Sequence, residues 1–239
     1  KDRVPEKRSP GKEPAARSAD VAAFLQKVAQ TPAVRPAGGR GRLMFAMEAT
    51  ASREPTWDRA CQLQGEMFHA TDGLGGLEVQ LVFYRGFGEC KASPWVDSSS
   101  ELVRRMVAVR CLGGQTQIGR VLTHCIRETE VKKVNALVFV GDCMEEDVDA
   151  LCHDAGRLGL VGVPAFMFQE GRDPVAERAF RQIARLTNGA YCSFDAASAQ
   201  QLKELLSAVA VYAAGGRLAL EDYGRRAGGA VLQIASQVK

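Results

Sequence analysis

Short apolar runs and longer amphipathic segments take turns along the chain from residue 42 to residue 212. The run 136–140 is apolar at every position, which is typical of a strand buried on both faces of a parallel sheet. Parallel strands need crossover connections, and helices normally supply them. The alternation therefore predicts an α/β fold with a doubly wound, mostly parallel sheet and helices on both faces.

The boundaries of these segments follow from periodicity and from turn residues. The predicted strands cover residues 43–47, 77–84, 89–92, 136–140, 163–168 and 190–194. The predicted helices cover residues 57–71, 99–110, 117–130, 146–159, 174–187 and 198–212. The glycine-rich loop 85–88 predicts a hairpin, and this hairpin gives the sheet one antiparallel edge strand.

The two ends of the chain differ from this central part. Residues 1–41 are predicted to form a basic, partly disordered arm, because residues 1–17 are charged and proline-rich and hold few large apolar side chains. Within the arm, Val21, Phe24, Leu25 and Val28 share one face of a short predicted helix, which we expect to pack on the main domain. That domain is predicted at 42–214. Residues 215–239 form a predicted tail, with a helix from Ala230 as one option.

Composition argues against a membrane-spanning protein and against a secreted protein held by disulfides. The chain is 46% hydrophobic and 25% charged, and no apolar run approaches the roughly 18–20 residues that span a bilayer. Seven scattered cysteines without a Cys-x-x-Cys pair fit a reducing compartment, and the N-terminus has no apolar signal-peptide core. We therefore expect a cytoplasmic protein without a membrane partner. A zinc site at Cys143, Cys152 and His153 is conceivable but not favoured.

Three polar motifs follow or precede the predicted elements at one edge of the sheet. Glu48, Thr50 and Ser52 follow the first strand, Asp142 follows the strand 136–140, and Thr116 precedes the helix 117–130. Ligand sites in doubly wound sheets lie beyond the carboxyl ends of the strands. Oxygen ligands suit hard cations such as Mg²⁺, Mn²⁺ or Ca²⁺. Each residue alone could instead cap a helix, but together they predict a metal site.

This constellation resembles the metal-ion-dependent adhesion site of the von Willebrand factor A (VWA) family. That site has the pattern Asp-x-Ser-x-Ser, then a threonine, then an aspartate after the fourth strand, and here Glu48-x-Thr50-x-Ser52, Thr116 and Asp142 correspond to it. The resemblance covers about residues 42–212 and is nearest to intracellular bacterial members. It implies a Rossmann-like, six-stranded sheet in the order 3-2-1-4-5-6. It also implies a cation that captures an acidic side chain of a protein partner.

Glu48 departs from the family pattern, which has aspartate at this position. The extra methylene moves the carboxylate by about 1.5 Å, one carbon–carbon bond. Mg²⁺ accepts little deviation from octahedral geometry. Two interpretations stay open: the site keeps its cation, with a water or a backbone adjustment absorbing the change, or it keeps the shape and binds partners without a metal.

The sequence favours a binding module over an enzyme. It has no Gly-x-Ser-x-Gly motif, and the Gly113–Thr116 segment lacks the lysine of a phosphate-binding loop. We therefore expect no catalytic residues. The resemblance suggests an adaptor for an ATPase chaperone as one role. The alternative is an RNA-binding or metal-free scaffold protein that uses the basic arm: residues 1–42 carry ten lysines and arginines against four acids.

Overall fold

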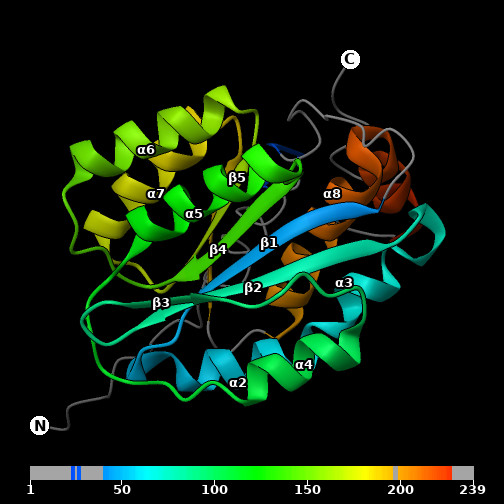
Figure 1. Ribbon diagram of the computed structural model, residues 1–239. Helices are drawn as coiled ribbons and strands as arrows, with labels where there is room; N and C mark the ends of the chain where they lie inside the picture. The colour runs from blue at the N-terminus through cyan, green and yellow to red at the C-terminus, as the bar shows by residue number, and fades with distance from the viewer. Residues whose placement is uncertain (1–22, 25, 28–39, 196–198, 228–239) are drawn as a thin grey trace, which may run out of the picture.

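A computed structural model of the protein describes residues 23, 24, 26, 27, 40–195 and 199–227. A six-stranded sheet in the order β3-β2-β1-β4-β5-β6 forms its centre (Figure 1). The strands are β1 (Gly41–Glu48), β2 (Leu77–Arg85), β3 (Glu89–Ala92), β4 (Ala136–Gly141), β5 (Ala165–Glu170) and β6 (Ala190–Phe194). All neighbouring strands pair in parallel except β2 and β3, which form the predicted antiparallel hairpin. The predicted fold class and strand order are confirmed.

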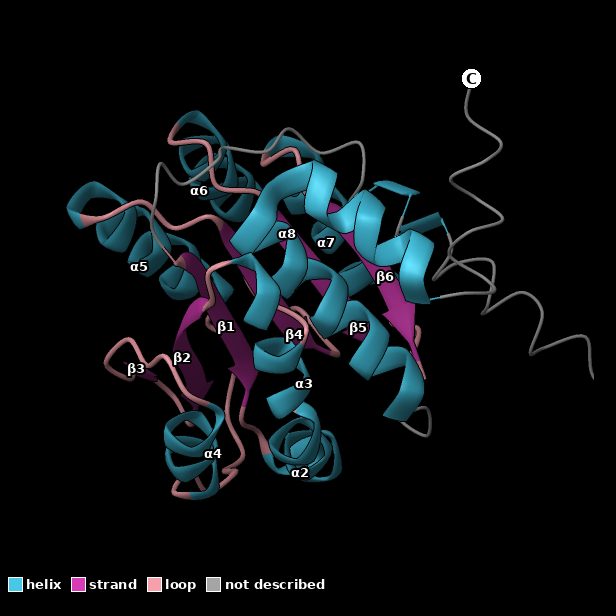
Figure 2. Ribbon diagram, turned by 90° about the vertical axis from the view of Figure 1, so that its right-hand side faces the viewer, coloured by secondary structure: helices cyan, strands magenta, loops and turns pink. Residues whose placement is uncertain are grey.

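Helices cover both faces of the sheet. They are α2 (Glu54–Leu63), α3 (Gly65–His69), α4 (Ser99–Val107), α5 (Ile118–Val131), α6 (Val148–Leu160), α7 (Pro174–Leu186) and α8 (Ala199–Ala227), with short 3-10 turns η1 (Ala51–Arg53) and η2 (Asp72–Leu74). Side chains of α2, α3, α4 and α8 fill one apolar core, and those of α5, α6 and α7 fill the other. Figure 2 shows α8 lying across the first of these faces. None of the described helices is long and apolar enough to cross a membrane.

Two helices differ most from their predicted extents, and the predicted helix 99–110 also ends earlier, at Val107. The predicted helix 57–71 begins earlier, at Glu54, and divides into α2 and α3. Helix α8 continues to Ala227, past the glycines where the tail was expected to begin, with a break at Gly216 (φ 71°). The segment after the break stays on the domain because Leu220 is buried in the same core as the first part of α8.

The described part of the N-terminal arm packs on the sheet, as predicted. Residues 23, 24, 26 and 27 are helical, and Phe24 is buried. Its ring meets the ring of Phe168 edge-on at 5.2 Å and that of Phe166 at 6.2 Å. The other predicted face residues of this helix, Val21, Leu25 and Val28, lie outside the described residues, as does the segment from Ala230.

The carboxyl ends of the central strands meet at one edge of the sheet. Met47 of β1 pairs with Val140 of β4, and Gly141 of β4 pairs with Gln169 of β5. The residues that follow in each strand or leave it therefore emerge side by side. This edge holds the polar residues that the sequence singled out.

Candidate metal-binding site

The first polar motif forms a chain of hydrogen-bonded oxygen atoms. Glu48 is the last residue of β1, and only 2% of its surface is exposed. The hydroxyl of Thr50 donates to Glu48 Oε1 at 3.0 Å, and it lies 3.2 Å from the hydroxyl of Ser52. The turn η1 lets the chain fold back so that these alternate residues face the same side.

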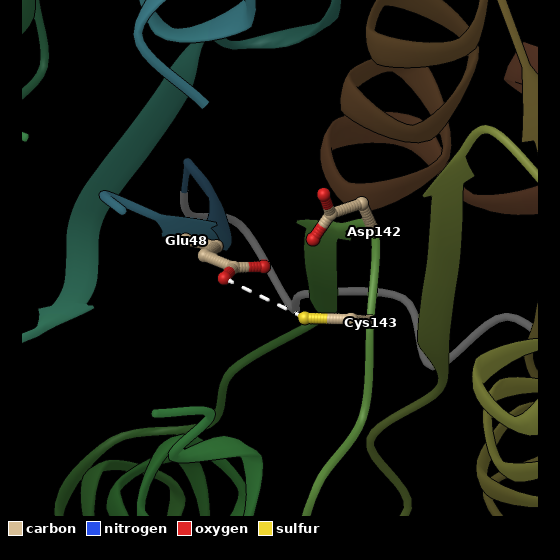
Figure 3. Close-up of side chains that lie close together, drawn as sticks. All are labelled: Glu48, Asp142 and Cys143. Atoms are coloured by element: carbon tan, nitrogen blue, oxygen red, sulfur yellow. Dashed lines mark hydrogen bonds between the residues drawn. The ribbon is translucent and has the colours of Figure 1, made fainter. Parts of the chain in front are cut away.

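A second carboxylate and a thiol face this chain from the end of β4. Ligand atoms of Glu48, Asp142 and Cys143 all lie within 4.8 Å of one another (Figure 3). Glu48 Oε2 and Asp142 Oδ1 are buried, and neither accepts a hydrogen bond from any described residue. The Cys143 sulfur lies 4.0 Å from Glu48 Oε1. The buried Glu48 and the partly exposed Asp142 thus each direct one buried, unpartnered oxygen into the same space.

The electrostatics of this cluster are unfavourable without a compensating charge. Burial, and then the charge of Asp142, raises the pKa of Glu48 to about 7, although the Thr50 hydrogen bond lowers it. Burial and the same two carboxylates raise the pKa of the Cys143 thiol. Tyr84, which pairs with Glu48 in the β1–β2 register, is fully buried, and its pKa is raised by burial and then by Glu48. Its hydroxyl also has no partner among the described residues.

Gly141 explains how the longer glutamate fits. A Cβ atom at this position would lie 2.8 Å from the Phe139 ring and 3.2 Å from Glu48 Oε2. The bare backbone of Gly141 therefore leaves the space into which the Glu48 carboxylate extends. The extra methylene is accommodated by a small neighbour on the adjacent strand.

An arginine lies against the same cluster. Arg53 is buried, with its guanidinium 2.7 Å from the Glu170 carboxylate at the end of β5 and 3.6 Å from Asp142 Oδ2. The hydroxyl of Thr56 also bonds to Glu170. Because Glu170 already balances the charge of Arg53, Glu48 and Asp142 together still carry an excess of negative charge when both are ionised.

Thr116 is attached to the loop that follows Asp142. Its hydroxyl accepts a hydrogen bond from the Glu145 amide at 3.0 Å, and its own amide donates to the Glu145 carboxylate at 3.3 Å. The structure thus joins Glu48, Thr50 and Ser52 by hydrogen bonds and brings Asp142 beside Glu48. Thr116 is bonded to the neighbouring loop rather than to the Glu48 chain.

The donor set fits a divalent cation. The two unpartnered carboxylate oxygens would supply charge, and the adjacent hydroxyl oxygens would supply neutral ligands of the kind that hard cations accept. Sequence reasoning did not identify Cys143 and Tyr84 as neighbours of this site. Cys143 adds a softer donor, which is better suited to zinc.

Comparison with known proteins supports the fold. No family model and no curated protein matches the chain. The solved VWA domain of SpRpn10 matches with a TM-score of 0.55 and 14% identity, over 70% of this chain and 94% of that one. An aerotolerance-related membrane protein of Bacteroides fragilis matches with a TM-score of 0.55 and 16% identity, over 70% and 96% of the two chains. The chain therefore has the fold of VWA domains.

A third similar structure contains a metal ion. Proximal thread matrix protein 1 of the mussel byssus, with a zinc-occupied MIDAS motif, matches with a TM-score of 0.52 and 17% identity. The match covers 78% of this chain and 47% of that protein. At this identity the likeness shows the fold alone.

Proposed function

We propose that the protein is a non-enzymatic binding module that captures an acidic side chain of a protein partner through a divalent cation. The observation that carries the proposal is the pair of buried, unpartnered carboxylate oxygens at the end of β1 and β4. The residues that would hold the ion are Glu48, Thr50, Ser52, Thr116 and Asp142. The ion would neutralise the two carboxylates and offer an electrophilic position to the partner's carboxylate. An adaptor for an ATPase chaperone is one role of this kind.

The identity of the ion depends on whether Cys143 takes part. Oxygen ligands alone favour Mg²⁺, Mn²⁺ or Ca²⁺, whereas a thiolate beside two carboxylates favours zinc. The zinc-occupied MIDAS motif of the mussel protein is consistent with a divalent ion at this site and does not distinguish the two options. If Cys143 is a ligand, replacing it with serine should weaken zinc binding. If the oxygens alone hold the ion, the same replacement should leave the binding of both zinc and Mg²⁺ nearly unchanged.

Calorimetry tests the metal part of the proposal. Titration with Mg²⁺, Mn²⁺, Ca²⁺ and Zn²⁺ should show one site, and Asp142→Asn and Glu48→Gln should each weaken binding at least about tenfold, or roughly 1.4 kcal/mol. Asp149→Asn is the matched control, because Asp149 is an exposed acid in the first turn of α6. If the parent protein binds none of the four ions, only the metal-free alternative survives.

Arg53 is the observation that favours that alternative. Its buried guanidinium is paired with Glu170 and touches Asp142, so an acidic partner would bind it by displacing one of these two contacts. A metal-free site would bind acidic partners equally well in EDTA and would lose this binding in Arg53→Gln. The RNA-binding alternative depends on the basic arm, most of which lies outside the described residues.

A displayed library of random peptides tests the choice of partner. We expect selection in Mg²⁺ to enrich sequences with aspartate or glutamate, and EDTA to release them. Enrichment without acidic residues would contradict the proposal.

A further inference from the structure

An exposed aromatic side chain stands at the tip of the β2–β3 hairpin. Phe87 is 87% exposed, whereas the other described phenylalanines are buried or partly buried. Strand β2 runs parallel to β1, and Tyr84 pairs with Glu48. The tip therefore lies at the same edge of the sheet as the candidate metal site.

The backbone of the tip is held in place from several directions. Gly86 and Gly88 have φ of 58° and 152°, values that favour glycine. The amide of Gln115 donates to Gly86 O at 3.1 Å, and Arg120 donates to Gly88 O at 2.5 Å. A Cβ at Gly114 would lie 2.2 Å from Gly86 O, so the two backbones are in direct contact. Phe87 is thus presented by a fixed turn, which lowers the entropy lost when a partner binds.

The loop that supports the tip also reaches the metal site. The amide of Leu112 donates to Ala49 O, between Glu48 and Thr50, at 3.0 Å. Thr116, at the other end of this loop segment, is bonded to Glu145, three residues after Asp142. A partner that contacts the site could therefore also contact Phe87 along a continuous surface.

The surroundings of Phe87 are basic. Arg85 and Lys91 are paired with Glu89, the carboxylate of the hairpin, and Arg120 donates to Gly88 O in the same hairpin. Arg85 also donates to the Arg110 carbonyl at 2.5 Å, which places the Arg110 backbone beside the hairpin. Arg110 and Arg120 are exposed, and neither makes an ion pair with any described residue.

The nearest carboxylates on the other side of the loop are already engaged. Glu145 accepts from the Thr116 amide, and Glu146 accepts from the amides of Ile118 and Gly119 at the start of α5. Both carboxylates keep their negative charge, but neither forms an ion pair with Arg110 or Arg120 among the described residues. The charge around the tip is complementary to an acidic segment.

We infer that Phe87, Arg110 and Arg120 form a second contact surface, the hairpin surface, for a short acidic segment of a partner protein. This inference rests on the proposed function, because the same segment supplies the carboxylate for the metal site. An apolar side chain of the segment packs on Phe87, and its further carboxylates pair with the two arginines. Phenylalanine and arginine side chains are both enriched at protein interfaces.

Fluorescence polarisation with synthetic peptides tests the hairpin surface. The probes are hexapeptides that carry two aspartates and one leucine or phenylalanine at varied positions, and matched peptides with asparagine in place of aspartate. In Mg²⁺, Phe87→Ala should lower the affinity for the tightest-binding acidic probe at least tenfold. Arg120→Gln should weaken it about threefold and reduce the dependence on salt.

The controls replace residues of the same type elsewhere on the surface. Leu160→Ala removes an 89% exposed apolar side chain at the end of α6, and Arg185→Gln removes an exposed arginine near the end of α7. Both should bind the probe as the parent does. Because the tip side chain is exposed, Phe87→Ala should keep the parent's circular dichroism and metal affinity.

The outcomes separate this inference from the proposed function. Binding that needs Phe87 but is equal in Mg²⁺ and EDTA supports the hairpin surface and contradicts capture through a cation. Binding that EDTA abolishes but Phe87→Ala leaves unchanged overturns the hairpin surface alone. The inference is also overturned if no acidic probe binds better than its asparagine counterpart, or if Phe87→Ala abolishes self-association of the parent in sedimentation.

Discussion

Strand β1 buries a charged side chain near each of its ends, and the groups around these two side chains differ in charge. Arg42, near the start, is 5% exposed, and its guanidinium lies 3.3 Å from Glu78, 3.6 Å from Glu128 and 3.7 Å above the Trp95 ring. Glu48, at the end, is 2% exposed and faces a second carboxylate, with one oxygen unpartnered. The first charge is compensated by the protein, and the second is not.

This difference separates a structural cluster from a functional one. Burying a charge is costly unless opposite charges and hydrogen bonds compensate it. The chain itself supplies the opposite charges for Arg42, although Arg42 Nε, 3.3 Å from Glu78, makes no hydrogen bond to any described residue. The Glu48 cluster meets it only when a cation or a proton is added from outside, and such incomplete groups with shifted pKa values are typical of binding sites.

The largest effect should come from breaking the compensated cluster. Arg42→Met should lower the free energy of unfolding by about 3 kcal/mol, because it leaves Glu78 and Glu128 without their buried partner. Urea unfolding measures this loss. Lys132→Met is the control: Lys132 is an exposed partner of Glu78, so its loss should matter by less than about 1 kcal/mol. Equal losses of unfolding free energy in both variants would mean that the buried Arg42 stabilises the protein no more than the exposed Lys132 does.

In the absence of metal, Glu48→Gln should raise the free energy of unfolding, whereas Arg42→Met should lower it. The native pKa of Glu48, about 7, lies above the ordinary value of 4.5, so the folded state holds the proton more tightly. Stability should therefore fall as pH rises from about 4.5 to 7, and the glutamine variant should lose this slope. At pH 8 in EDTA it should be more stable than the parent by up to about 3 kcal/mol.

Urea unfolding between pH 5 and pH 8 measures this difference. Saturating metal should abolish the advantage of the glutamine variant, because the ion compensates Glu48 in the parent. If the free energy of unfolding changes with pH equally in the two proteins, the slope does not come from Glu48.

Gly141→Ala should cost about 2 kcal/mol through overpacking, because the new methyl group would lie 2.8 Å from the Phe139 ring. It should also displace the Glu48 carboxylate and weaken metal binding. Gly156→Ala is the matched control, since a Cβ there meets nothing within 4 Å in helix α6. This control should be neutral or stabilising by up to about 1 kcal/mol. Thermal unfolding measures the stability of both variants. An equal change in their melting temperatures would exclude crowding at Gly141.

Trp95→Phe should give the smallest effect, about 1 kcal/mol. It removes the hydrogen bond from the indole to Glu128 at 2.7 Å and weakens the contact with Arg42. Urea unfolding should record this loss, while calorimetry should show unchanged metal affinity. A change in metal affinity would mean that the two ends of β1 are coupled, which would undermine their separation into two clusters.

The sequence predicted the sheet well because its apolar runs are strong and regular. It also predicted that Glu48 and Asp142 emerge at the same edge, because that follows from parallel strand direction. It did not predict the unpartnered Tyr84 hydroxyl or the space above Gly141, which depend on strand register and on side-chain packing. The continuation of α8 past Gly216 likewise depends on tertiary burial of Leu220, which overrides the local signal of two glycines.

Titration of the Glu48 side chain itself shows whether the charge of this carboxylate is compensated within the protein. Carbon-13 labelling of the glutamate carboxyls, with Glu48→Gln for assignment, lets NMR follow this one group. In EDTA we expect a midpoint near 7, and in saturating Mg²⁺, Ca²⁺ or Zn²⁺ we expect the midpoint to fall by at least about one pH unit. A midpoint near 4.5 in EDTA, or a midpoint that none of these ions changes, would contradict the account.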